Sequence, residues 1–189
     1  ITTGEGGVII TNNKDLINKV KVIKSIGLNT PPEKRKIPGV YDVTNLGLNY
    51  RLTDFQAALA IGQMKRYNKN LERRRANAKY YIQKIKKIKK LTIQDFDNNH
   101  SYFILQVFFK NKETRNKILL KFKKQNIGSS IHYATPVPLM TYYKKKYKMK
   151  KNNFINAIKY GENSISLPTH PFIKKKMINE ILKVIEKNI

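Results

Sequence analysis

An amide, a phenol and a guanidinium follow one another at Asn49, Tyr50 and Arg51, just before a segment that is expected to begin a helix. Thr53 lies three residues before Gln56, a spacing typical of a capping box, in which each side chain bonds the other residue's backbone N–H. Amide and guanidinium donors beside a helix N-terminus suit an anion such as a phosphate. The alternative is an ordinary helix cap, in which Asn49 and Arg51 satisfy local carbonyl groups.

The elements before this cluster follow from glycines and from the spacing of apolar residues. The glycines of residues 4–7 allow a tight turn, and residues 8–10 are expected to form a short buried strand. Asn13 is expected to cap a helix over residues 14–25, with an apolar inner face and with Gly27 at its end.

After the cluster, helical periodicity runs from Phe55 towards Lys90, which is longer than a globular helix usually is. A bend is expected near residues 67–70, where the apolar spacing lapses. The second half, residues 71–90, is predicted to link two domains, so that residues 1–70 form one region and residues 91–189 a small α+β domain.

The small domain is expected to start with a strand over residues 102–110, whose apolar face comprises Phe103, Leu105, Val107 and Phe109. Asn111 is expected to cap a following helix that closes near residues 126–128. Residues 127–133 are predicted to be a second strand, which makes a β-α-β run. Further helices are expected over residues 154–163 and, as an amphipathic final helix, from Met177 to Ile185.

Composition sets weaker bounds on function. The chain has no Cys and only three dispersed His, so neither a disulfide framework nor a metal site is expected. No apolar run approaches the roughly 20 residues of a membrane span, and the N-terminus has no signal-peptide pattern, so we expect a cytoplasmic protein without a membrane partner.

The net charge of +27 raises the alternative of a basic nucleic-acid-binding protein. Only seven of the 39 basic residues are Arg, the residue that reads base edges and phosphates bidentately, and Lys is scattered over every segment. We therefore expect no specific nucleic-acid partner, although nonspecific adhesion to polyanions at low salt is expected.

Four segments, in order along nearly the whole chain, resemble the DegT/DnrJ/StrS family of pyridoxal-phosphate-dependent nucleotide-sugar aminotransferases. The segment Gly47-Leu-Asn-Tyr-Arg-Leu-Thr-Asp-Phe-Gln-Ala-Ala58 resembles the family's G-x-N-Y-R-[ML]-T-D-x-Q-A-A pattern. The other three are Thr2-Thr-Gly-Glu-Gly-Gly7, the stretch that begins His132-Tyr-Ala-Thr-Pro136, and Ser166-Leu-Pro-Thr-His-Pro171.

The resemblance implies an α/β fold, PLP-dependent transferase fold type I, of which this chain would hold the tail of the large domain and the small domain. It also implies that pyridoxal 5'-phosphate is the cofactor. The reaction would transfer an amino group from an amino acid such as glutamate to a keto-sugar nucleotide, for surface polysaccharide or glycan biosynthesis.

For the site, the resemblance implies that Asn49 reaches across a homodimer interface to the cofactor phosphate of the neighbouring subunit, so the active sites would be shared. Arg51 is implied as a scaffold or substrate contact, and His132 and Tyr133 as the pair that faces the sugar or amino donor. For His132 alone, a structural role is the alternative. His100 and His170 are expected to be structural.

The Lys that forms the Schiff base lies just before the T-T-G-E-G-G strand in this family, and so is expected immediately upstream of Ile1. Ile1 itself is not Met, which suggests a fragment, and this chain alone is expected to be inactive. A dehydratase-like or non-catalytic relative of the same fold remains an alternative. The family's frequent aromatic residue before Asn49 is Leu48 here.

Overall fold

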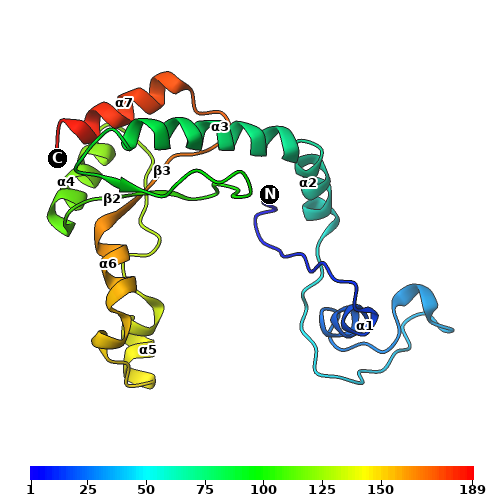
Figure 1. The fold of residues 1–189 in the computed structure, drawn as a ribbon. Helices are drawn as coiled ribbons and strands as arrows, with labels where there is room; N and C mark the ends of the chain where they lie inside the picture. Colours follow the sequence, from blue (N-terminus) through cyan, green and yellow to red (C-terminus); the bar gives the residue numbers. More distant parts are fainter. The chain divides into compact units, whose positions relative to one another are not determined.

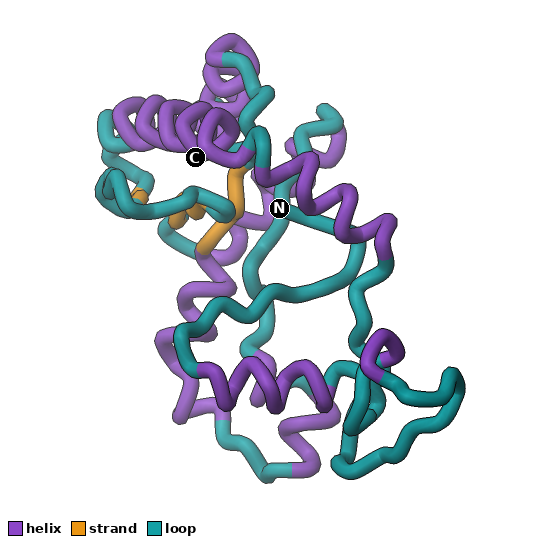
Figure 2. Tube along the Cα trace, turned by 90° about the vertical axis from the view of Figure 1, so that its right-hand side faces the viewer, coloured by secondary structure: helices purple, strands orange, loops and turns teal.

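A computed structural model describes residues 1–189, which divide into two compact units, residues 1–67 and residues 68–189. The first unit contains helix α1 (Lys14–Ile23), the short 3-10 helix η1 (Pro32–Lys34) and helix α2 (Asp54–Met64). Loops connect them and make up most of this unit (Figures 1 and 2).

Helix α1 forms as its sequence predicts. Asn13 Oδ1 accepts a hydrogen bond from the backbone N–H of Leu16 at 3.1 Å, which caps the N-terminus. At the other end, Gly27 adopts a φ of 76° and its N–H donates to Val22 O at 3.0 Å, so a glycine closes the helix. The apolar face of α1 borders a hollow of about 620 Å³ within this unit, which residues 7–9 also line.

The prediction of a buried strand at residues 8–10 is wrong. These residues form no strand, and Ile10 is 93% exposed. The reason is that no segment of the first unit runs alongside to complete a hydrogen-bonded ladder, and an apolar run becomes a buried strand only with neighbours on its edges and faces.

Helix α2 has the predicted capping box. Thr53 Oγ1 accepts from the Gln56 N–H at 3.3 Å, and Gln56 Oε1 accepts from the Thr53 N–H at 3.0 Å. The helix is interrupted close to the bend expected near residues 67–70, slightly earlier than predicted: α2 ends at Met64 and α3 begins at Tyr67.

The second unit begins with helix α3 (Tyr67–Ile85) and continues with β1 (Thr92–Ile93), β2 (Leu105–Phe108) and helix α4 (Lys112–Lys124). The segment that follows α4 contains η2 (Val137–Leu139), α5 (Thr141–Lys146), η3 (Lys151–Phe154) and α6 (Ile155–Asn163). It ends with β3 (Ser164–Leu167) and helix α7 (Lys175–Glu186).

The three strands form one antiparallel sheet in the order β1-β2-β3, with Gln106 of β2 opposite Ser166 of β3. Helices α3 and α7 lie side by side (Figure 1), and the Tyr80 hydroxyl donates to Asn179 Oδ1 at 2.9 Å between them. The helix expected to link domains therefore packs in the second unit along one face, where Ala78, Tyr81, Ile82 and Ile85 are buried.

The prediction of a strand over residues 127–133 is wrong, and the predicted β-α-β run is therefore wrong as well. Only Ser130 in this segment pairs with a strand, through an isolated bridge to Ser166. The third strand is instead residues 164–167, which follow α6 without a break. The strand expected over residues 102–110 is shorter than predicted, and Phe103 lies outside it with 75% of its surface exposed.

The core of the second unit joins the apolar sides of α3, α4 and α7 to one face of the sheet. Its largest fully buried side chains include Tyr81, Phe122, Ile85, Leu105, Ile118, Ile165, Ile178 and Ile185. The predicted helices after Asn111 and over residues 154–163 are confirmed, as is the inward apolar stripe of α7. This burial is the main source of stability for the unit.

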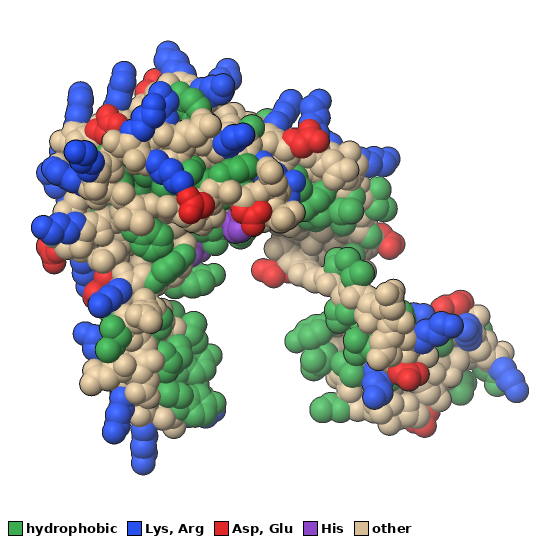
Figure 3. All heavy atoms as spheres, viewed as in Figure 1, with side chains coloured by type: hydrophobic (Ala, Val, Ile, Leu, Met, Phe, Trp, Pro, Cys, Tyr) green, Lys and Arg blue, Asp and Glu red, His purple; other side chains and the backbone are tan.

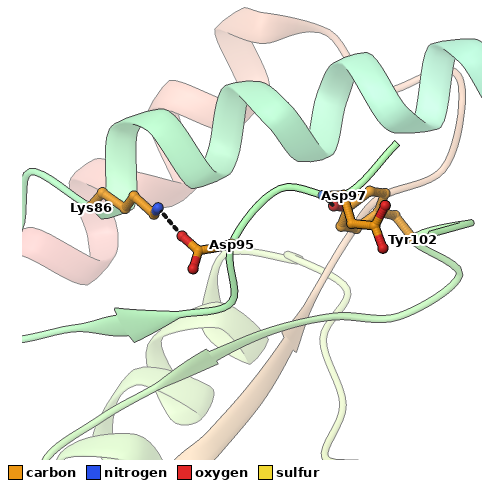
Figure 4. Close-up of polar contacts among 4 residues, drawn as sticks. All are labelled: Lys86, Asp95, Asp97 and Tyr102. Carbon is orange, nitrogen blue, oxygen red and sulfur yellow. Dashed lines mark hydrogen bonds and ion pairs between the residues drawn. The ribbon is translucent and has the colours of Figure 1, made fainter. Parts of the chain in front are cut away.

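The loop between β1 and β2 is tied to this core at two points (Figure 4). Lys86, just beyond α3, forms an ion pair with Asp95. The buried Tyr102 hydroxyl accepts a hydrogen bond from the backbone N–H of Asp97 at 2.6 Å. The Tyr102 N–H donates to His100 Nδ1 at 2.9 Å, which fits the structural role expected for His100.

On the face that Figure 3 shows, basic side chains are spread over both units rather than gathered in one patch. Within the only Arg cluster, Arg75 Nε donates to His100 O at 3.0 Å and Arg74 lines a hollow beside His132. None of the helices combines the length and the apolar character that a membrane span requires.

Candidate functional site

The loop that carries Asn49 is bound to the C-terminal end of α1. The N–H of Leu48 donates to Ile23 O at 2.7 Å, and the N–H of Tyr50 donates to Lys24 O at 2.9 Å. The Leu48 carbonyl in turn accepts from the Ile26 N–H at 3.1 Å. The loop thus satisfies carbonyls that a helix end leaves without partners, and the backbone on both sides of Asn49 is fixed.

Asn49 and Arg51 contact each other. Arg51 Nε donates to Asn49 Oδ1 at 3.1 Å, and both side chains are exposed. Because a guanidinium can only donate, the amide atom that faces it must be the oxygen, so the Asn49 NH₂ group points away from Arg51. The Asn49 Nδ2 and the Arg51 terminal nitrogens have no protein partner and are free to donate to an anion.

This geometry bears on one of the two interpretations of the segment, the ordinary helix cap. The N-terminus of α2 is capped by Thr53 and Gln56, whereas Asn49 and Arg51 satisfy no local carbonyl. They are therefore not parts of an ordinary helix cap. The amide and guanidinium donors would suit a phosphate group.

The glycine-rich segment at the start of the chain is attached to α2 by two glutamines. Gln56 Nε2 donates to Glu5 O at 2.7 Å, and Gln63 Oε1 accepts from the Thr2 N–H at 2.9 Å. The Gln56 side chain thus makes two contacts: its Oε1 accepts in the capping box, and its Nε2 binds the glycine-rich segment. The segment that, by the resemblance, immediately follows the Schiff-base Lys is in this way fixed to the same helix that follows Asn49.

In the second unit, His132 is held through its ring and its backbone. His132 Nδ1 lies 2.8 Å from Ser166 Oγ, and Gln106 Nε2 donates to His132 O at 3.2 Å. The neighbouring Tyr133 ring lies edge-on to the imidazole, with 5.4 Å between ring centroids, and 66% of Tyr133 is exposed. The structure therefore brings these two predicted residues together, as it does Asn49 and Arg51 in the first unit.

Two hollows border His132. One, of about 400 Å³, is lined by Arg74, Ser130, Ser166 and His170 among others. The other, of about 410 Å³, is lined by Tyr133, Val137, Asn156 and Tyr160 among others. An imidazole that borders a hollow can hydrogen-bond a substrate group there, as a donor or as an acceptor.

Sequence reasoning missed Gln106 and Tyr160. Gln106 is buried in β2 between Leu105 and Val107, and a polar residue inside such an apolar run was a signal that could have found it. The Tyr160 hydroxyl donates to Gln106 Oε1, and burial raises the pKa of Tyr160, which keeps the hydroxyl protonated. Ser166 belongs to a recognised segment, but its bond to His132 was not foreseen.

Comparisons with known proteins assign the chain to a family. Residues 1–186 match the DegT/DnrJ/EryC1/StrS aminotransferase family. The chain is 31% identical over 200 residues to an uncharacterized protein of Methanocaldococcus jannaschii. The match covers all of this chain and 52% of that protein. It is 34% identical over 177 residues to a UDP-4-amino-4,6-dideoxy-N-acetyl-beta-L-altrosamine transaminase of Campylobacter jejuni, covering 90% of this chain and 44% of that protein.

Among solved structures, Helicobacter pylori PseC, an aminotransferase involved in the biosynthesis of pseudaminic acid, superposes with a TM-score of 0.84 at 25% identity. The superposition covers all of this chain and 50% of PseC. It confirms the predicted α/β class, PLP-dependent transferase fold type I. The chain spans about half the length of the curated relatives it matches, and by sequence and fold it belongs to the DegT/DnrJ/EryC1/StrS aminotransferase family.

Proposed function

We propose that this chain is the C-terminal portion of a pyridoxal-phosphate-dependent aminotransferase. The whole protein would transfer an amino group from an amino acid, glutamate in the first instance, to a keto-sugar nucleotide used for surface polysaccharide or glycan biosynthesis. Family membership and the transaminase named among the relatives support this proposal. The observation that carries it in the structure is the Asn49–Arg51 pair, whose free donors suit a phosphate.

The cofactor, when bound, supplies an electron sink for amino-group transfer. The residues present fit its phosphate: Asn49 offers an NH₂ group whose direction is set by Arg51, and Arg51 adds a positive charge. We propose that they bind the phosphate of a neighbouring subunit, in a homodimer with shared active sites. The Schiff-base Lys would be supplied from outside residues 1–189, so these residues alone would be inactive.

On the substrate side, we propose that His132 and Tyr133 contact the sugar or the amino donor. In this assignment residues 1–70 end the large cofactor domain, residues 71–90 link the domains, and residues 91–189 form the small domain. A small domain of this kind would exclude water from the substrate when it closes. The hydroxyl of Tyr133, a largely exposed residue, and the free nitrogen of His132 are the polar groups that would face the substrate.

The test is cofactor affinity in the whole protein that contains these residues, measured by fluorescence titration for Asn49→Ala and Asn49→Asp. Loss of one charge-assisted hydrogen bond should weaken binding about tenfold in the alanine variant. Asn49→Asp should weaken it roughly a further tenfold, because a carboxylate would face the phosphate. A dissociation constant within about twofold of wild type for Asn49→Ala would show that Asn49 does not hold the phosphate.

Asn45→Ala is the matched control. Asn45 lies in the same exposed loop, but its amide donates to the neighbouring Thr44 Oγ1 at 3.1 Å and has no contact with Arg51. This variant should leave cofactor affinity unchanged. An equal loss in both variants would instead indicate a general disturbance of the loop.

A further inference from the structure

The sheet of the second unit has an apolar face and a polar face. Side chains alternate along a strand, so the inward apolar residues of β2 and β3 leave Gln106, Ser164 and Ser166 on the opposite face. Gln106 and Ser166 are direct register partners, and their side chains therefore share this face. Both are at least nine-tenths buried, and both bond to His132.

Gln106 connects His132 to helix α6. Its Nε2 donates to the His132 carbonyl at 3.2 Å, and its Oε1 accepts from the Tyr160 hydroxyl. A carbonyl can only accept, so the amide atom facing His132 must be the nitrogen, and Tyr160 must then donate. The directions of both hydrogen bonds are thereby fixed, and a part-buried network whose members are satisfied in this way favours one arrangement.

Ser166 fixes the imidazole itself. Its Oγ lies 2.8 Å from His132 Nδ1, and its backbone is anchored on both sides, by β2 and by the N–H···O bond to Ser130 at 2.8 Å. Nδ1 is thereby occupied within the protein. Nε2 is the ring nitrogen without a protein partner, and His132 borders both hollows.

We propose that Gln106, Tyr160 and Ser166 are positioning residues that orient His132 so that Nε2 is presented to substrate. That Nε2 meets a substrate rests on the proposed function, whereas the orientation of the ring does not. The three residues act through His132: Gln106 and Tyr160 fix the peptide that carries the ring, and Ser166 fixes Nδ1. Tyr160 is itself held by an edge-on contact with Phe108, whose ring centroid is 5.0 Å away.

The test is the tautomer and ring environment of His132, measured by long-range ¹⁵N–¹H NMR on the ¹⁵N-labelled chain at alkaline pH. The chain has three histidines, which makes each assignable from a single His→Gln variant. His100 is an internal reference, because its Nδ1 accepts from the Tyr102 N–H and its proton must be on Nε2. The variants are Ser166→Ala, Gln106→Met and Tyr160→Phe, with Tyr147→Phe as the control at an exposed tyrosine.

Ser166→Ala should shift the His132 Nδ1 signal and mix the tautomers. Gln106→Met and Tyr160→Phe should shift the His132 signals too, although neither removes a bond to the ring. Tyr147→Phe should shift nothing, and His100 should be unchanged throughout. If His132 does not move in Gln106→Met and Tyr160→Phe while the melting temperature falls, these two residues are only structural and the proposal is wrong.

If Gln106→Met does not fold, Tyr160→Phe decides alone, because it keeps the ring that packs on Phe108 and removes only the hydroxyl. In the whole protein, Tyr160→Phe should lower kcat/KM for the sugar substrate about tenfold and leave cofactor affinity unchanged. An equal loss of cofactor affinity would contradict a role through His132. A shifted His132 tautomer in a protein that shows no transaminase activity would overturn the proposed function but not the positioning.

Discussion

Gly27 and Gly47 pack backbone against backbone: a Cβ on Gly47 would lie 1.9 Å from the backbone nitrogen of Gly27. No side chain fits there, since real Cβ contacts do not come so close. The contact brings the end of α1 against the loop of Asn49, and the hydrogen bonds of Leu48 and Tyr50 to α1 depend on it. Gly47 to Arg51 form the first part of the family-like segment 47–58. These residues therefore meet a packing requirement at Gly47 as well as supplying hydrogen-bond donors at Asn49 and Arg51.

We therefore expect Gly47→Ala to detach this loop from α1, at a cost of about 1–3 kcal/mol, as for other overpacked sites. The measurement is hydrogen exchange at the amides of Leu48 and Tyr50. Their protection should fall by roughly 10- to 100-fold. Gly62→Ala is the control, because a Cβ at Gly62 in α2 would meet nothing within 4 Å. Unchanged protection in Gly47→Ala would refute the close approach.

Arg51→Lys separates charge from geometry at the same site. Lysine keeps the positive charge but cannot both hold Asn49 Oδ1 through Nε and offer a planar fork. In the whole protein we expect cofactor affinity to fall by about three- to tenfold. We also expect a non-additive result in the double variant with Asn49→Ala, because the two residues act as one unit. Full additivity would mean that Arg51 does not orient Asn49.

Two buried tyrosines should respond to loss of the hydroxyl in opposite directions. The Tyr81 hydroxyl is buried without a hydrogen-bond partner, whereas the Tyr102 hydroxyl accepts from the Asp97 N–H (Figure 4). Tyr81→Phe should be neutral or stabilising by up to about 1 kcal/mol, and Tyr102→Phe should destabilise by about 1–2 kcal/mol. Urea denaturation of both variants checks this, and equal destabilisation would contradict it.

The same burial predicts a pH dependence. It raises the pKa of Tyr81 because the charged form is desolvated. The folded chain then keeps this proton at a pH where the unfolded chain has lost it, so stability should fall as pH rises above the ordinary tyrosine pKa of about 10. Tyr81→Phe should flatten that decline. An unchanged alkaline slope in the variant would show that Tyr81 does not cause it.

The Lys86–Asp95 pair should contribute only above acidic pH. The hydrogen bond and charge of Lys86 lower the pKa of the exposed Asp95 carboxyl below its ordinary value. Because the folded-state pKa is the lower one, the contribution is present above the unfolded carboxyl pKa of about 3.9 and is lost as pH falls through the folded pKa. The difference in melting temperature between wild type and Asp95→Asn should therefore be small at neutral pH, shrink with added salt, and vanish in acid.

Local chemistry allowed the sequence to predict some elements well. Asn13 and Asn111 cap helices where their side chains were expected to, and the Thr53–Gln56 box forms as its spacing indicated. In each case the signal and the structure lie within four residues of one another. The Asn49 and Arg51 donors were found for the same reason, because both lie beside a recognisable helix start.

Features that depend on distant partners were not predictable. The apolar run 8–10 resembles a buried strand, but burial needs neighbours that its own residues do not specify. Strand β3 was missed because it follows α6 with no loop between them, and its pairing depends on β2, far away in sequence. The link from Tyr160 through Gln106 to His132 likewise joins three elements that only the fold brings together.

The last prediction concerns Gly161→Ala. The position of Gly161 in a helix predicts that the substitution stabilises the fold, whereas its tertiary contact predicts that it destabilises the fold. It lies inside α6, where replacing glycine by alanine normally stabilises by about 1 kcal/mol. A Cβ here, however, would lie 2.2 Å from the Tyr133 carbonyl oxygen and 3.0 Å from that of Ala134. Gly161→Ala should therefore destabilise by about 1–3 kcal/mol and displace the segment that carries His132 and Tyr133.

The readouts are urea denaturation and the NMR signals of His132 in the same variant. Gly128→Ala is the control, because Gly128 has open space around its Cβ position and no positive φ. The sign of the stability change is decisive, because backbone carbonyls cannot move aside as a flexible side chain would. If α6 tolerates alanine at this position, the segment that carries His132 and Tyr133 is not packed against it. If Gly161→Ala is more stable than wild type and the His132 signals do not shift, α6 does not help to position His132.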